Sequence, residues 1–327
     1  MVYLRNINIM AKNKKTIKKN ILITGGSGFI GSALTKYLVE SNHNVIVYDN
    51  NSRGNLRRLT SVIKKIKFIK GDIRNRKRLF SIKEKVDTVI HLAYVNGTEF
   101  FYKKPFEILD IAVNGLVNIL DFSKKKGVKN FYLASSSEVY QNPTKIPTDE
   151  KEMLKIPDIH NPRYSYGGGK IISELYGIHF AKKYFKKFII FRPHNVYGND
   201  MGNEHVIPQF INRFDKLKKG NKFLIYGTGN EQRSFIYIDD FVSGFDKIFK
   251  KGKNREIYNI GTTQKIKISD LARLVAKILN KKIQFKKTKI LKGSPSIRCP
   301  NINKINKLGF KYEISLEEGI RRIIKLR

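Results

Sequence analysis

The chain contains one cysteine, Cys299, and far fewer acidic than basic residues. A single cysteine excludes an intramolecular disulfide and provides no cysteine-based metal site, which is typical of proteins of the reducing cytoplasm. The six histidines lack metal-ligand spacing. No apolar run approaches the ~20 residues of a membrane-spanning helix, and no charged-then-apolar secretory signal opens the chain. We therefore expect a cytoplasmic protein with neither a membrane segment nor a metal centre.

The shortage of acidic residues leaves a large positive charge. Lys and Arg number 65 against 27 Asp and Glu, which gives a formal net charge of +38. Such a charge normally indicates nucleic acid or an anionic membrane as a partner. However, the lysines are spread over nearly every expected surface helix and loop rather than gathered into one stripe with interleaved aromatic residues. A general lysine bias explains this better, so we expect neither partner. A basic nucleic-acid-binding protein is the alternative of a different class.

A glycine-rich stretch near the start is the most informative feature that is present. The aliphatic run 21–23 stops at a glycine cluster, and an apolar pattern of helical period follows at once. Gly26, Gly28 and Gly31 fit G-x-G-x-x-G, while Gly25, Gly28 and Gly31 fit a looser version. This pattern predicts a strand, a tight turn and a helix whose free N–H groups bind a diphosphate.

An acidic residue follows this turn at the spacing that a dinucleotide site requires. Asp49 ends the run Val45–Tyr48, about 20 residues after the glycines, where a carboxylate hydrogen-bonds the adenosine ribose. A carboxylate there would repel a 2′-phosphate. The expected cofactor is therefore NAD rather than NADP.

The rest of the chain alternates strand and helix patterns. Strands are expected near 45–48, 66–69, 86–92, 129–135 and 188–192. Helical stretches separate the first four of these strands, and the longest of these stretches runs from about 105 to 126. The alternation predicts an α/β fold with a Rossmann-type, doubly wound parallel sheet and a smaller mixed α/β lobe. We expect a basic tail at 1–20 with Met10 as a possible true start, a dinucleotide-binding domain at 21–195, and a substrate lobe mainly at 196–327 with segments returning to the first domain.

Polar side chains follow three of the predicted strands, at the edge where parallel sheets bind ligands. Asp72 follows the third, His91 ends the fourth, and Ser136 follows the fifth. Asp72 is equally compatible with a helix cap, and His91 with a hydrogen-bonded core histidine.

A tyrosine and a lysine four residues apart form a candidate proton-transfer site. On a helix, Tyr166 and Lys170 share one face. A lysine ammonium and an oxidised nicotinamide would favour the phenolate, which could remove a hydroxyl proton while Ser136 hydrogen-bonds that hydroxyl. Three glycines, 167–169, precede the lysine. Because glycine weakens a helix, they suggest a close approach of the backbone to a ligand.

With these residues the sequence resembles the extended short-chain dehydrogenases/reductases, in the nucleotide-sugar epimerase and dehydratase branch. The resemblance covers most of residues 21–327. The matching segments are Thr24–Gly31, Asp49-Asn50, Gly71–Arg74, His91–Ala93, Ser136–Tyr140, Tyr166 with Lys170, Arg192–Gly198, Gln232–Asp240 and Asn259–Gly261.

The resemblance implies a role for each matching residue. Tyr166 is the expected base, Lys170 also binds the nicotinamide ribose, and Ser136 completes the triad. The expected contacts to NAD are Gly25, Gly28, Phe29, Ile30, Gly31, Asp49, Asn50, Asp72, Ile73, Leu92 and Ala93, together with Tyr166 and Lys170. The expected ligands of a nucleotide-diphosphate sugar are Ser136, Asn195, Arg233 and Arg298, with Leu224 and Tyr226 near the base. A homodimer is also implied, formed by helices near 105–126 and 163–186.

The resemblance leaves the reaction open after oxidation at C4 of the sugar. Reduction from the other face would give a 4-epimer, whereas elimination would give a 4-keto-6-deoxy sugar. Elimination needs a further acid or base, and Glu138, beside Ser136, is a candidate. The segment 137–140, Ser-Glu-Val-Tyr, resembles dehydratases and uronate decarboxylases more than simple 4-epimerases. Glu138 could equally be a structural ligand of a neighbouring loop. Uronate decarboxylation is the third choice, because Asp110 stands where such enzymes tend to carry lysine.

The sequence departs from its relatives near the expected sugar pocket. Tyr94 stands where alanine is usual, Gln141 where glycine is usual, and the triple glycine before Lys170 is uncommon. Asn301 also follows Pro300 where relatives often have aspartate, which bears on Arg298. These departures concern the sugar pocket rather than the cofactor site.

Overall fold

The computed structural model describes residues 18–218, 222–282, 284–287 and 295–327. The predicted tail therefore lies almost entirely outside the described residues. Within them, no helix is long and apolar enough to cross a membrane.

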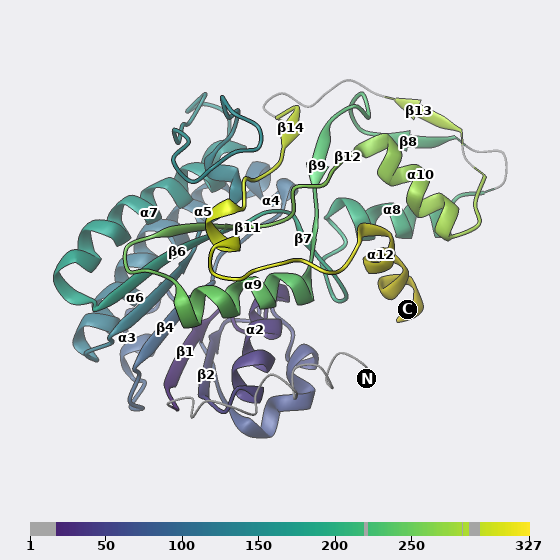
Figure 1. Cartoon of the computed structure of the whole chain (residues 1–327). Helices are drawn as coiled ribbons and strands as arrows, with labels where there is room; N and C mark the ends of the chain where they lie inside the picture. Colours follow the sequence, from purple (N-terminus) through teal and green to yellow (C-terminus); the bar gives the residue numbers. More distant parts are fainter. Residues whose placement is uncertain (1–17, 219–221, 283, 288–294) are drawn as a thin grey trace.

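A seven-stranded parallel sheet forms the centre of the molecule (Figure 1). Its strand order is β11-β6-β5-β4-β1-β2-β3. The order reverses direction beside β1, as in doubly wound folds, so a crevice opens at the carboxyl ends of β1 and β4. The strands are β1 Asn20–Thr24, β2 Asn44–Asp49, β3 Ile66–Lys70, β4 Thr88–His91, β5 Asn130–Ala134, β6 Lys187–Pro193 and β11 Ile257–Ile260.

The sheet is buried on both faces, which explains its continuous aliphatic strands. In β1, Ile21 and Ile23 pack into one apolar cluster while Leu22 packs into the other, and all three are fully buried. Successive side chains of a strand point to opposite faces, so only a strand that is apolar throughout can lie between two helical layers.

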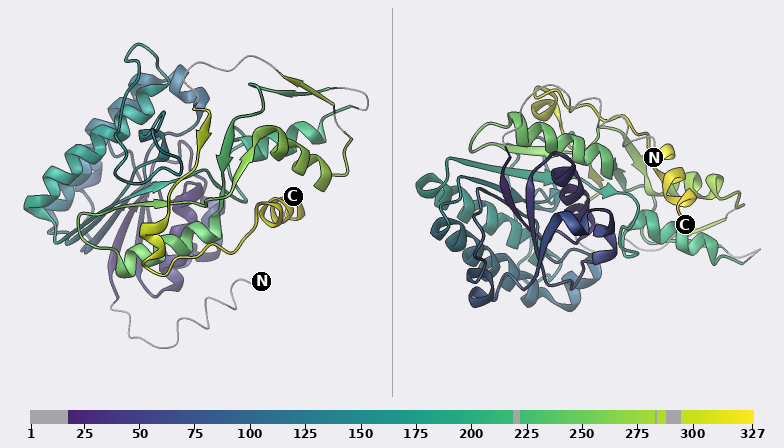
Figure 2. Two further views of the ribbon diagram at one scale, coloured as in Figure 1. Left: turned by 45° about the horizontal axis from the view of Figure 1, so that its top comes forward. Right: turned by 90° about the horizontal axis from the view of Figure 1, so that it is seen from below.

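Helices cover the two faces, as Figures 1 and 2 show from different sides. One face carries α2 Phe29–Glu40 and α9 Ile238–Lys251, with α11 Asn303–Asn306 against α9. The other carries α3 Arg76–Phe80, the continuous helix formed by α5 Pro105–Asp110, η2 Ile111–Gly115 and α6 Leu116–Lys125, and α7 Tyr164–Tyr184. The short helices α4 Thr98–Lys103, η1 Leu56–Lys65 and η3 Ser137–Val139 lie in the connections.

A smaller lobe stands beside the carboxyl ends of the strands. It contains three small sheets, namely β10-β7, β12-β9-β14 and β13-β8. Its elements are β7 Val196–Tyr197, α8 Val206–Asp215, β8 Phe223–Ile225, β9 Gln232–Ser234, β10 Ile236–Tyr237, β12 Lys265–Lys267, α10 Ile268–Ile278, β13 Phe285–Lys287, β14 Ile297–Arg298 and α12 Leu316–Lys325.

The two parts share one apolar core. The cluster that holds Ile21 and Ile23 continues through Phe241 of α9 to Phe210 of α8 and Phe223 of β8. β11 and α9, which follow the first part of the small lobe in sequence, also pack onto the large sheet. The chain thus crosses between the two parts several times after residue 195.

Candidate functional site

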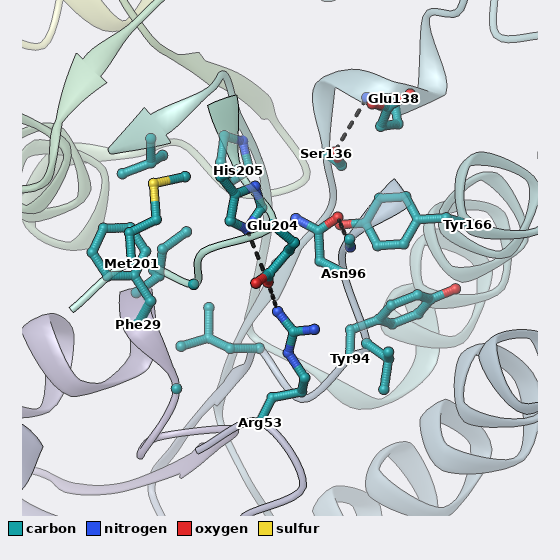
Figure 3. Close-up of a pocket in the computed structure, with 18 of the residues that line it drawn as sticks. Phe29, Arg53, Tyr94, Asn96, Ser136, Glu138, Tyr166, Met201, Glu204 and His205 are labelled. Carbon is teal, nitrogen blue, oxygen red and sulfur yellow. Dashed lines mark hydrogen bonds and ion pairs between the residues drawn. The ribbon is translucent and has the colours of Figure 1, made fainter. Parts of the chain in front are cut away.

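A cavity of about 820 Å³ lies where the carboxyl ends of the strands face the small lobe (Figure 3). All of the predicted cofactor residues line it. Of the predicted catalytic and substrate residues, only Leu224 is not part of the lining. Segments that are far apart in sequence therefore meet at the edge of the sheet where the sequence placed the site.

The glycine-rich turn forms one wall of this cavity. Gly25 has φ +74°, and a Cβ there would lie 2.7 Å from the backbone nitrogen of Ala93. A Cβ at Gly31 would overlap the carbonyl oxygen of Gly25. α2 begins after Gly28 without a side-chain cap, so the N–H groups of its first turn face the cavity unscreened, as phosphate binding requires.

The acid at the end of β2 is anchored by the glycine turn and by the loop that follows β2. One carboxylate oxygen of Asp49 accepts a hydrogen bond from the Ser27 N–H at 3.0 Å, and the other from the Asn51 N–H at 2.8 Å. These bonds fix the carboxylate at the cavity wall. Asp49 lines the cavity at the end of the second strand, the place from which a carboxylate binds a ribose hydroxyl in dinucleotide sites.

Asp72 belongs to an ion-paired cluster rather than to a helix cap. It accepts hydrogen bonds from Asn50 at 3.0 Å and from Arg74, and these donors hold the pKa of its carboxyl below the ordinary value. Arg74 also binds Asp110 at 3.0 Å. The cap of α3 is instead Asn75. The alternative that Asp72 caps a helix is therefore wrong.

His91 behaves as a core histidine. Its Nδ1 lies 2.7 Å from the Thr24 hydroxyl, and burial lowers the pKa of the ring to about 3. The imidazole is therefore neutral, and its hydrogen bond with Thr24 joins β4 to β1. The neighbouring Leu92 and Ala93, with Ile73, line the cavity with apolar surface.

Ser136, Tyr166 and Lys170 meet on the wall opposite the glycine turn. The Tyr166 ring is sandwiched between Phe101, stacked at 4.9 Å, and Tyr94, edge-on at 5.1 Å. Burial raises the pKa of the Tyr166 phenol, and a hydrogen bond with Ser136 opposes the rise. The protein alone thus keeps Tyr166 protonated, and the expected phenolate needs the positive charge that a bound oxidised nicotinamide would add.

Lys170 is buried beside this tyrosine. Its Nζ donates to the carbonyl oxygen of Ala134 at 2.7 Å and lies 4.0 Å from the centre of the Tyr94 ring. Burial lowers the pKa of its ammonium to about 7, against the opposing effect of Glu174. The lysine is therefore poised between its two protonation states near neutral pH.

Glu138 forms an ion pair with Arg298, with Nη1 and Oε1 2.7 Å apart. Burial opposes its ionisation, but Arg298 and Arg163 outweigh burial and hold the pKa of the carboxyl below its ordinary value. The sequence predicts Glu138 as an acid or base and Arg298 as a diphosphate ligand. In the structure the two side chains form an ion pair with each other. The second terminal nitrogen of Arg298, Nη2, is buried without a partner among the described residues, which suits an anionic ligand.

The other predicted substrate residues come from the small lobe. Asn195 has φ +40° and donates its amide to the Ser234 carbonyl at 2.8 Å. Arg233 donates to the carbonyl of Pro295 at 2.8 Å, and burial together with Arg298 lowers the pKa of its guanidinium to about 9. Tyr226 lines the cavity and is largely exposed, whereas Leu224 presents its carbonyl to Arg213.

The triple glycine of α7 has a different cause from the one predicted. A Cβ at Gly169 would overlap the Tyr94 hydroxyl, and one at Gly167 would lie 2.5 Å from the Gln141 amide. The glycines make room for side chains of the protein itself. The large side chains at 94 and 141 are thus each matched by a glycine.

One feature of the cavity was not predicted. Arg53, from the loop after β2, forms an ion pair with Glu204 of the small lobe, and its guanidinium lies 4.6 Å from the centre of the Phe100 ring. Figure 3 shows this pair in the middle of the cavity wall. No local pattern could indicate it, because the partners are 151 positions apart.

Together these features fit NAD, from the uncapped helix terminus to the anchored Asp49 and the Tyr166–Lys170 pair. Such a site on a Rossmann-type sheet defines a dinucleotide-dependent enzyme of the extended short-chain dehydrogenase/reductase class.

The comparisons with known proteins make this assignment specific. The model of the NAD dependent epimerase/dehydratase family matches residues 21–261. The chain therefore belongs to this family, whose cofactor is NAD.

The similar proteins include both 4,6-dehydratases and 4-epimerases. A dTDP-D-glucose 4,6-dehydratase of Dictyostelium discoideum is 36% identical over 282 residues, which cover 80% of this chain and 62% of that protein. The UDP-glucose 4-epimerase of Thermotoga maritima, solved with UDP-glucose, superimposes with a TM-score of 0.85 at 29% identity, over 94% of this chain and 97% of that one. The dTDP-glucose 4,6-dehydratase of Streptomyces venezuelae, solved with NAD, also gives 0.85 at 25% identity, over 94% of this chain and 96% of that one.

Proposed function

We propose that the chain is a nucleotide-sugar 4-epimerase that oxidises C4 of a hexose and reduces it again from the other face. NAD, when bound, would accept the hydride from C4 and return it. Tyr166 would exchange the hydroxyl proton, Ser136 would orient that hydroxyl, and Lys170 would hold the nicotinamide ribose and favour the phenolate. Arg233 and Arg298, with Asn195, would bind the diphosphate.

The protonation of the carboxyl groups that line the cavity favours epimerisation over elimination. Elimination of the C6 hydroxyl needs an acid that can donate a proton to it. Three carboxyl groups that line the described cavity have a pKa held below the ordinary value by neighbouring donors and cations, which favours the ionised form. These are Asp72, Glu138 and Glu231. Epimerisation needs no such acid.

A 4,6-dehydratase is the second candidate, and one observation favours it. Glu138 is ionised and lines the cavity beside Ser136, so it could serve as the base that removes the C5 proton. The same carboxylate could also be mainly a partner of Arg298. Uronate decarboxylation stays the third choice, with Asp110 engaged by Arg74.

Incubation with UDP-, GDP-, dTDP- and CDP-hexoses distinguishes the candidates. We expect a 4-epimer detectable by NMR with at least one of them. A 4-keto product that absorbs in alkali would instead identify a dehydratase. If neither forms from any of these sugars, the proposal is wrong.

Replacement of Glu138 by Gln tests its role directly. For an epimerase we expect kcat to fall by less than about tenfold, because the amide oxygen can still accept from Arg298. For a dehydratase, loss of the base should reduce product formation by about 10²–10⁴-fold. The exposed Glu99→Gln serves as the control, since its carboxylate pairs with Lys103 on the surface.

We further propose a homodimer built on α5–α6 and α7. These neighbouring helices expose apolar side chains on one surface, including Phe106 at 81% and Leu175 at 59% exposure. A second copy of the same surface would cover them as a four-helix bundle.

A charge on this surface should break the dimer. Leu175→Glu is expected to elute as a monomer in gel filtration with light scattering, while Leu56→Glu, at an exposed apolar position on η1, should elute as the parent does. A parent protein that is already monomeric would contradict the proposal.

The cytoplasm is the proposed location, in keeping with the single, buried, unpaired Cys299. No nucleic acid is expected to bind specifically. Tight, salt-dependent DNA binding without bound NAD would favour the nucleic-acid-binding alternative.

A further inference from the structure

Tyr94 is a large side chain inserted between the cavity and the helix that carries Tyr166 and Lys170. Its ring lines the cavity, packs edge-on against Tyr166, and lies under the Nζ of Lys170 at 4.0 Å. In Figure 3 the Tyr166 side chain reaches into the cavity, whereas the Tyr94 hydroxyl points away from its centre. The Tyr94 ring therefore packs against both predicted catalytic side chains, Tyr166 and Lys170.

The hydroxyl of Tyr94 does not explain why the residue is there. It is buried without a hydrogen-bond partner among the described residues. A Cβ at position 169 would overlap the Tyr94 hydroxyl oxygen. The same Cβ would lie 3.6 Å from Cζ, the ring carbon that carries this hydroxyl, which is an ordinary contact. The contacts that Tyr94 makes through its ring are thus the informative ones.

The ring acts on the Lys170 ammonium. A cation over an aromatic face is attracted to it, the more so where water is excluded. One hydrogen of the ammonium is used by the Ala134 carbonyl. The ring and this carbonyl together fix Nζ, and the ammonium keeps further donors for a ligand.

We propose that Tyr94 is a positioning residue, which holds the Lys170 ammonium in place for the nicotinamide ribose, and that Gly169 is the residue that makes room for it. The proposal rests on the role given above to Lys170. It goes beyond it by assigning a task to a side chain outside the Ser136–Tyr166–Lys170 set.

NAD affinity provides a readout that does not depend on the sugar. NAD is removed from each purified variant, and the Kd for NAD is measured by isothermal titration calorimetry. For Tyr94→Leu, which keeps an apolar cover but has no ring, we expect about tenfold weaker binding. Tyr94→Phe keeps the ring and should bind within about twofold of the parent. Equal affinity of the Leu variant and the parent would overturn the proposal.

The glycine supplies a rescue experiment. Gly169→Ala should weaken NAD binding, since the new methyl displaces the Tyr94 hydroxyl and with it the ring. In the double variant Gly169→Ala/Tyr94→Phe the overlap with the hydroxyl is gone and affinity should return most of the way; the remaining contact, 2.8 Å to the Ala112 methyl, is common to both variants. If the double variant binds no better than Gly169→Ala, Gly169 does not serve Tyr94 and the proposal fails.

Gly168→Ala is the matched control on the same helix. Its methyl would approach only the end of the Ile156 side chain, at 3.1 Å. It gains the same helix propensity as Gly169→Ala. We expect Gly168→Ala to leave the affinity for NAD unchanged. A weaker affinity in Gly169→Ala would then be due to the contact of the new methyl with Tyr94 and not to a general effect on the helix.

The pH dependence separates positioning from general loss of structure. The groups that face Lys170 are Glu174 and Tyr166 on α7, His91 on β4, and Tyr94. Burial lowers the pKa of Lys170 to about 7, so NAD affinity should fall as the pH rises through that region. Without the ring the ammonium is less stable, and the midpoint should move down by about 0.5–1 pH unit. An unmoved midpoint in Tyr94→Leu would contradict the assignment.

This design also separates two kinds of failure. A parent protein that binds NAD but converts no nucleotide sugar would refute the proposed function and leave the test of Tyr94 intact. Normal turnover with unchanged NAD affinity in Tyr94→Leu would refute only the role of Tyr94.

Discussion

Tyr166→Phe is expected to reduce kcat by about 10²–10⁴-fold while leaving the fold and NAD binding intact. The phenol is the only hydrogen-bonding group that the substitution removes, and positioned acid–base groups contribute about 10²–10⁴-fold to rates. The ring stays between Phe101 and Tyr94, so its packing is kept. The measurement is turnover of whichever sugar proves to be the substrate, together with NAD content and thermal unfolding.

The control for this substitution is Tyr184→Phe on the same helix. Tyr184 is exposed at the far end of α7, and we expect its variant to turn over at the rate of the parent. Retained turnover in Tyr166→Phe would exclude the proposed proton transfer, whichever reaction the enzyme catalyses.

Glu174→Ala is expected to lower the free energy of unfolding by about 3–5 kcal/mol. Glu174 pairs with Arg192 at 2.5 Å, and the two side chains are 3% and 2% exposed. Removal of one partner leaves an uncompensated buried charge, which is the strongly destabilising case. Urea or guanidinium unfolding, monitored by circular dichroism, would measure the change.

An exposed pair provides the comparison. Glu317→Ala removes the partner of Arg321 on α12, at the surface, and should cost less than about 1 kcal/mol. A loss below 1 kcal/mol in Glu174→Ala would show that water reaches Arg192. The double substitution Arg192→Met/Glu174→Met should recover much of the loss, because an apolar pair of similar volume carries no desolvation penalty.

The features that could be predicted from the sequence are those that depend on residues within one short segment. The glycine turn requires residues without a Cβ at fixed spacing, and β1 requires a continuous aliphatic run because it is buried on both faces. The predicted strands agree with the observed ones within about two residues at each end. The Rossmann-type fold, the family and NAD are confirmed. The roles of the single site residues stay predictions.

What could not be predicted depends on pairs that only the folded chain brings together. Glu138 and Arg298 are 160 positions apart, and each has a plausible role of its own. The sequence could not indicate that they neutralise one another. The glycines 167–169 were misinterpreted for the same reason, since the side chains that fill the space beside two of them, Tyr94 and Gln141, belong to other segments.

The contact between Tyr94 and Gly169 has a consequence for how such a sequence can arise. Any side chain at 169 would overlap the Tyr94 hydroxyl, so a tyrosine cannot be accepted at 94 while 169 carries one. Glycine at 169 without the tyrosine costs only about 1 kcal/mol of helix stability. Forward substitution therefore requires glycine at 169 before tyrosine at 94, and reversal requires the opposite order, with the tyrosine lost before the glycine. The two positions are thus coupled, and a side chain at 169 is compatible with this cavity only when residue 94 is smaller than tyrosine.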